Sequence, residues 1–174
     1  LQVVPYMESE NRGGFLANAD SIVDMLQDNA LVTHSQKVSE KGGLLKTAED
    51  FEGVTVKAVG ENYNWAIIKQ YLVEGSTPIY RDSVYNDSIL ISVSLKDRLE
   101  LETGQEVVVF FLRQPPKPPL MRRFIVSGSF ATGMEEFDGS YVIAHDKHIL
   151  KINKWETGSA GKVEVSLDHE LNEE

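Results

Sequence analysis

Two histidines stand closest to metal chemistry in this sequence. His145 and His148 are three residues apart in His-Asp-Lys-His, and on a helix both rings could face one side and bind a metal ion. The sequence places no third ligand beside them, and Asp146 is of a type that caps the start of a helix. We therefore expect the start of a helix here, and no metal site.

An acidic cluster, formed by Glu135, Glu136 and Asp138, could supply acid–base chemistry or calcium ligands. Paired carboxylates act as acid and base only when their environments separate their two pKa values, and neighbours in a turn share one environment. The segment also lacks the regularly spaced oxygen ligands of a calcium loop. We expect a solvated turn.

Motifs for nucleophilic catalysis and for phosphate binding are missing from the sequence. There is no Gly-x-Ser-x-Gly frame and no glycine-rich phosphate loop. There is also no cysteine, which removes thiol nucleophiles, disulfides and cysteine zinc sites. The prediction is a protein that is not an enzyme, with no catalytic residue, no metal and no cofactor of its own.

The most distinctive segment is 113–123, which holds four cations and four prolines and no acid in a chain of net charge -10. One interpretation is a solvated hairpin tip, where charge and proline prevent pairing at the sheet edge. The other is a stiffened finger that docks on an acidic partner or on lipid headgroups, because prolines lower the entropy cost of binding. The candidate contact residues are Arg113, Gln114, Pro115, Pro116, Lys117, Pro118, Pro119, Met121 and Arg122.

Composition limits the class of protein further. The 174 residues suffice for one domain or two small subdomains, and 41% hydrophobic with 25% charged residues is typical of a globular chain. With 17 basic and 27 acidic residues the surface repels phosphate backbones, so no nucleic acid partner is expected. The longest apolar run, 107–112, is far shorter than the roughly 20 residues that span a bilayer.

Periodicity predicts an α+β protein with short helices and mixed or antiparallel sheets. A polar loop is expected at 76–87, in which Tyr80 and Tyr85 would be semi-exposed. A Gly42-Gly43 turn is expected to join two arms of a hairpin, and Ser92 or Ser94 to cap a helix. Helices are predicted at 17–27, 65–72, about 93–99 and 146–155, and strands at 1–6, 31–38, 44–46, 54–59, 89–91, 105–112, 120–132, 141–144 and 162–167.

Several segments together resemble one family. The run Ile89-Leu90-Ile91-Ser92, then Gly104-Gln105-Glu106-Val107, then 123–130, is similar to the MacB-type periplasmic core domain of FtsX-like ABC transporter permeases. This family includes the MacB efflux pump and the lipoprotein-releasing LolC/LolE-like permeases. Segments 64–65, 72–75 and 132–138 look like its Bacteroidetes-type members. The resemblance covers residues 30–168; Gln105 stands where an acid is common, and the 113–123 loop is short for the family.

The resemblance implies a function and a setting. The chain would be a single extracytoplasmic domain over 1–174, cut from between two membrane helices, with both termini facing the membrane. Two interleaved subdomains are implied, an outer one at about 31–87 and a membrane-proximal one from 1–30 and 88–174. It would be the periplasmic domain of an inner-membrane permease subunit, coupling ATP-driven motion to transport of a lipoprotein or another envelope substrate.

The implied partners are a second permease subunit in a homo- or heterodimer, a cytoplasmic ATPase reached through the membrane helices, and a lipoprotein or periplasmic carrier. ATP would bind to that separate nucleotide-binding subunit. The alternative is a free-standing secreted α+β binding module, for which the resemblance would describe the fold only.

Overall fold

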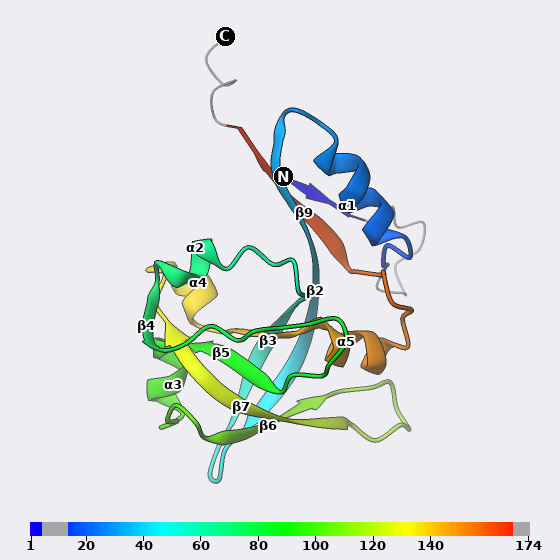
Figure 1. Cartoon of the computed structure of the whole chain (residues 1–174). Coiled ribbons are helices and arrows are strands. Elements are labelled where there is room, and N and C mark those ends of the chain that lie inside the picture. Colours follow the sequence, from blue (N-terminus) through cyan, green and yellow to red (C-terminus); the bar gives the residue numbers. More distant parts are fainter. Residues whose placement is uncertain (5–13, 169–174) are drawn as a thin grey trace.

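A computed structural model describes residues 1–4 and 14–168 of the chain. Helices and strands are interspersed along the sequence (Figure 1). The end of the strand expected at 1–6 lies outside the described residues. The elements are β1 (Gln2–Val3), α1 (Ala19–Gln27), β2 (Val32–Lys46), β3 (Phe51–Val59), α2 (Ala66–Lys69), β4 (Leu72–Gly75), β5 (Ser88–Ser92), α3 (Val93–Arg98), β6 (Glu106–Phe111), β7 (Leu120–Phe130), α4 (Glu135–Asp138), β8 (Tyr141–His145), α5 (Asp146–Asn153) and β9 (Lys162–Leu167).

The main body is a closed barrel. The strand order is β1-β9-β2-β3-β8-β5-β7-β4, and β6 pairs with both β2 and β7. Because β6 joins these two distant strands, the strands β2, β3, β8, β5, β7 and β6 form a ring. The pairs β3–β8 and β5–β7 are parallel and the other pairs of the ring are antiparallel. The predicted α+β class with a mixed sheet and short helices is confirmed.

Alternate residues of these strands fill the barrel. Phe111, Phe124 and Val126 are fully or almost fully buried, as are the inward residues of the other strands. Helix α3 adds Leu95 to this core and α5 adds Ile149. The Ser92 hydroxyl accepts a hydrogen bond from the Leu95 N–H at 3.0 Å, so the predicted cap of α3 is confirmed.

A second apolar layer lies outside the barrel, over β3, β8 and β5. Here the segment 60–80 lays Tyr63, Ile68 and Tyr80 against outward residues of the strands such as Leu90 and Ile143. Tyr80 is only 3% exposed, so the expectation of a semi-exposed ring is wrong for it. The aromatic ring covers the barrel wall, while its hydroxyl donates to the Ser88 carbonyl at 2.8 Å.

A small lobe stands above the barrel in Figure 1 and consists of α1, β1, β9 and the first part of β2. Its core includes Ala19, Val163 and Val165. The Leu1 amino group donates to the Val165 carbonyl at 3.0 Å, so the chain enters and leaves this lobe side by side. The strand β2 continues from this lobe into the barrel, and the division at 31–87 stays a prediction.

Three local expectations are wrong. Gly42 and Gly43 do not form a turn but lie inside β2, because residues 38–46 pair continuously with β3, and the turn comes at 47–50. The helix expected at 65–72 is only the four-residue α2, because Leu72 pairs with β7 and draws the chain into β4. Asp146 lies inside α5, and the residue at its N-cap is His145.

Candidate functional site

The basic segment forms the exposed connection between β6 and β7, which extends beyond the side of the barrel (Figure 1). Its tip is held by its own bonds: Arg113 Nε donates to the Pro118 carbonyl at 2.7 Å, and the Lys117 N–H donates to the Gln114 carbonyl at 3.1 Å. The prolines Pro115, Pro116, Pro118 and Pro119 are all exposed. The tip is thus a shaped and accessible cationic loop.

The candidates that follow the tip separate onto two faces of β7. Met121 is exposed and lies opposite Phe110 on the outside of the barrel. Arg122 points to the other side, where its positive charge contributes to lowering the pKa of His148. Side chains alternate along a strand, so neighbours in sequence cannot serve one surface here.

Cations gather around Tyr85 at that second face. The Nζ atoms of Lys147 and Lys151 lie 5.7 and 5.6 Å from the centre of its ring, which is 51% exposed. The edge of the same ring meets His148, with centroids 5.6 Å apart. No motif in the sequence marked these lysines, although their spacing of four residues on a predicted helix was a usable signal.

The two histidines hold the loop before β5 instead of a metal. His145 Nδ1 accepts from the Asn86 N–H at 3.2 Å, and His148 Nε2 lies 3.1 Å from the Asn86 carbonyl and 3.2 Å from Asp87 Oδ1. His145 stacks on Tyr80 with ring centroids 4.7 Å apart. Within the described residues, no group of three or more His, Cys, Asp or Glu side chains is placed to hold a metal ion.

Burial sets the charge of these histidines. The His145 side chain is fully buried, which lowers its pKa to about 4, and the nearby charges of His148 and Lys147 act in the same direction. Burial also lowers the pKa of His148. Among the described residues, His145 Nε2 and His148 Nδ1 find no hydrogen-bond partner. Both rings are therefore neutral at neutral pH and serve to position Asn86.

The acidic cluster is divided between structure and solvent. The Asp138 carboxylate accepts from the Thr132 N–H and hydroxyl and from the Gly133 N–H, at 2.8 to 3.1 Å. Glu135 and Glu136 are exposed. The expected solvated turn is instead the one-turn helix α4, whose aspartate fixes the preceding loop.

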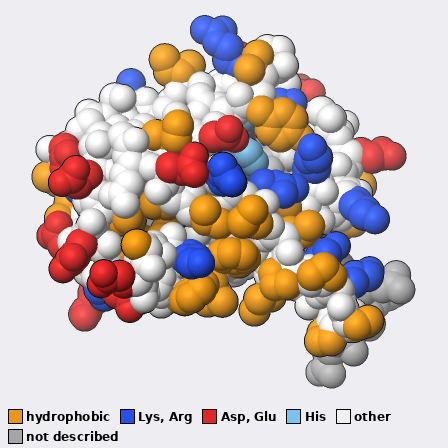
Figure 2. Space-filling view, turned by 90° about the horizontal axis from the view of Figure 1, so that it is seen from below, with side chains coloured by type: hydrophobic (Ala, Val, Ile, Leu, Met, Phe, Trp, Pro, Cys, Tyr) orange, Lys and Arg blue, Asp and Glu red, His pale blue; other side chains and the backbone are white. Residues whose placement is uncertain are grey.

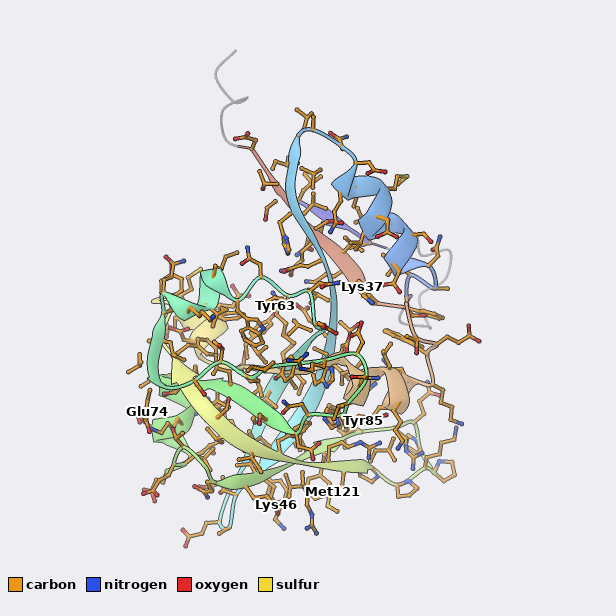
Figure 3. All side chains as sticks on the ribbon, in the orientation of Figure 1. Lys37, Lys46, Tyr63, Glu74, Tyr85 and Met121 are labelled. Carbon is orange, nitrogen blue, oxygen red and sulfur yellow. The ribbon has the colours of Figure 1, made fainter. Side chains whose placement is uncertain are left out.

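An apolar surface that the sequence did not predict lies on the outside of β2, β3, β6 and β7, and we call it the bare face. One row across it joins Leu44, Phe110 and Met121 in register, and Phe51 lies beside Phe110 with ring centroids 6.3 Å apart. Figure 2 shows hydrophobic side chains gathered on the molecule seen from this side, and Figure 3 shows Lys46 and Met121 there. Its full membership is Leu44, Phe51, Val108, Phe110, Leu112, Met121 and Ile125, all of them partly or fully exposed.

The fold is similar to those of two solved transporter domains, whereas no family model and no curated protein sequence matches the chain. One is the periplasmic region of MacB from Actinobacillus actinomycetemcomitans, with a TM-score of 0.62, 12% identity, and coverage of 99% of this chain and 75% of that one. The other is the extracellular domain of the noncanonic ABC-type transporter YknZ from Gram-positive bacteria, with a TM-score of 0.64, 16% identity, and coverage of 97% and 84%. At these identities the likeness establishes the fold, which is that of MacB-like periplasmic domains. None of the helices in the described part is long and apolar enough to cross a membrane.

Proposed function

We propose that this chain is the extracytoplasmic domain of an ABC transporter permease subunit. The observation that carries the proposal is the fold, which matches the MacB and YknZ domains over nearly the whole chain. The structure has two features that a domain tethered to the membrane at both ends would need. β1 pairs antiparallel with β9, so the first and last described residues lie at one side, and the small lobe there is continuous with the barrel through β2.

The proposed role is mechanical and not enzymatic. A domain that transmits movement needs a rigid body, and the closed barrel with its packed interior is one. The side chains considered for metal or acid–base chemistry make structural contacts instead. His145 and His148 position Asn86, and Asp138 fixes the loop at Thr132. ATP would be hydrolysed on a separate cytoplasmic subunit. The membrane helices would transmit the movement of that subunit to the domain.

The proposed cargo is a lipoprotein or another envelope substrate, and the proposed partner is a second permease subunit. The resemblance of the sequence to a family that includes lipoprotein-releasing permeases supports this cargo. The exposed cationic tip at Arg113 and Lys117 is a contact candidate for a periplasmic carrier, since its prolines limit its motion before binding.

The experiment replaces residues 2–167 of the full-length protein by a short Gly-Ser linker. Because Leu1 and Val165 are bonded, such a linker can join the two ends without straining the rest. We expect the purified transporter to keep its basal ATPase activity and to lose substrate movement in proteoliposomes. Met25→Gln, an exposed substitution on α1, serves as the matched control and should keep both activities.

Substrate movement by the linker variant would refute the coupling role. Isolation of the full-length protein from culture medium, without membrane helices or an ATPase partner, would instead establish the free-standing secreted binding module.

A further inference from the structure

The bare face contains a notch made by two glycines on neighbouring strands. On the outer surface Gly42 of β2 lies opposite Thr55 of β3, and Leu44 lies opposite Gly53. The missing side chains leave an open hollow of about 400 Å³, bordered by Leu44, Thr55 and Leu112. It lies beside the aromatic end of the face, where Lys46 is opposite Phe51.

The chain's own packing does not explain these two glycines. A Cβ on the neighbouring Gly43 would lie 2.7 Å from Val109 Cγ1, so glycine is needed there. A Cβ on Gly42 or Gly53 would meet nothing within 4 Å, and neither residue has a left-handed backbone. Glycine inside a strand weakens it, and it often marks a place where a ligand or another chain approaches closely.

Charge at the aromatic end of the bare face indicates the chemistry of what approaches. The Lys46 amine lies 5.5 Å from the centre of the Phe51 ring, and Arg123 lies opposite Val108 on the same surface. The Arg123 side chain is 68% exposed, with Glu106 at 3.8 Å. Two cations on an apolar face of a protein with net charge -10 are complementary to carboxylates beside apolar groups.

We propose that the bare face binds an extended acidic segment of a partner protein, which inserts one bulky apolar side chain into the Gly42/Gly53 notch. Carboxylates on the side of that anchor toward Phe51 would lie against Lys46 and Arg123, which flank Val108 in one row of the face. A single buried anchor in a pocket with a charged rim is a common design of protein interfaces. This inference does not depend on the proposed transport function.

Two other occupants fit the surface less well. A second copy that presented the same face through a two-fold axis would bring the same two cations from each copy into one interface, which like charges disfavour. A lipid acyl chain needs an enclosed apolar channel, whereas this notch is open to solvent along the sheet.

The test is a titration of the isotopically labelled chain with short peptides, followed by NMR of the backbone amides. The probe is acetyl-Glu-Phe-Glu-Leu-Glu-amide, compared with its lysine counterpart and with acetyl-Glu-Ser-Glu-Ser-Glu-amide. We expect the first peptide to shift the amides of Gly42, Gly53 and Leu112 and to bind at least about tenfold more tightly than the other two.

Variants that fill the notch separate binding from folding. Gly53→Val adds a β-branched side chain where the strand has room, so its thermal midpoint should be unchanged or higher, while peptide affinity should fall at least about tenfold. Gly42→Thr should have the same effects on stability and affinity, and it serves as the test if Gly53→Val fails to fold. Lys46→Glu should also lose affinity, whereas Lys69→Glu, an exposed change on α2, should not.

Wild-type affinity in folded Gly53→Val and Gly42→Thr, or equal binding of the lysine peptide, would refute the proposal. It would also fail if the same amides shift only on raising the chain concentration, which would assign the face to a second copy. Shifts that occur only with phosphatidylglycerol vesicles would assign it to lipid and refute the proposal in the same way.

Discussion

Protonation of the buried His145 is expected to destabilise the protein as pH falls. The pKa of this ring is about 4 in the folded chain, against 6.5 for an ordinary histidine, so the unfolded chain binds a proton more readily. Stability is therefore fully present above pH 6.5 and is lost progressively as pH falls from 6.5 to about 4. The physical causes are burial first, and then electrostatic repulsion from His148 and Lys147.

The size of the effect follows from the shift. One pKa unit corresponds to about 1.4 kcal/mol, so the change from 6.5 to about 4 removes about 3 kcal/mol once both states are protonated. At pH 5 the loss is already about 2 kcal/mol. That is a large share of the 5–15 kcal/mol that is typical of folded domains at about 25 °C.

The assay is urea unfolding of the wild-type chain and of His145→Gln between pH 4.5 and 7.5. The glutamine amide can still accept from the Asn86 N–H but does not titrate, so the variant should lose most of the dependence on pH below 6.5 that this ring contributes. His34→Gln, in the small lobe, is the matched control and leaves both buried histidines in place. Equal slopes for the wild type and His145→Gln, or an NMR titration midpoint of His145 near 6.5, would refute this reasoning.

Three further substitutions test the packing, each measured by the same unfolding experiment. Gly128→Ala should cost about 1–3 kcal/mol, because its Cβ would lie 2.5 Å from the Glu74 carbonyl oxygen; unchanged stability would mean that β4 and β7 do not approach so closely. Phe124→Ala should cost about 3–5 kcal/mol by leaving a cavity inside the barrel, and a loss below about 1 kcal/mol would contradict the packed interior. Tyr80→Phe should cost about 1 kcal/mol, because the Ser88 carbonyl loses its donor, and a gain in stability would show that this bond is not made.

Local sequence patterns predicted the elements that depend on local physics. The apolar spacing at 17–27 gave a helix that the structure shows as α1, and Ser92 caps α3 as expected, since a cap needs only its own helix. The alternation at 162–167 and the apolar run at 105–112 are strands β9 and β6. β6 ends at Phe111, and the exposed prolines from Pro115 onward lie outside the sheet, where no ladder hydrogen bond is needed from them.

Several wrong local predictions share one cause, which is contact with segments far away in the sequence. Two adjacent glycines usually signal a turn, yet Gly42 and Gly43 stay extended because both pair with β3, opposite Thr55 and Val54. Helical spacing around Ile68 gave way to β4 after one turn, since β7 offers Leu72 a partner. Tyr80 lies in a polar stretch, but the chain folds that stretch back over the barrel wall.

The candidate surface was predictable only in part. The sequence by itself determined the fold class, the basic proline-rich tip and the lack of catalytic motifs, because composition and short-range periodicity carry that information. Only the tertiary structure decided that β6 closes the barrel, that Met121 and Arg122 serve opposite faces, and that Gly42 and Gly53 lie together on an uncovered apolar surface. These features depend on which strands pair and in which register, and that choice is made by the whole core and not by any segment alone.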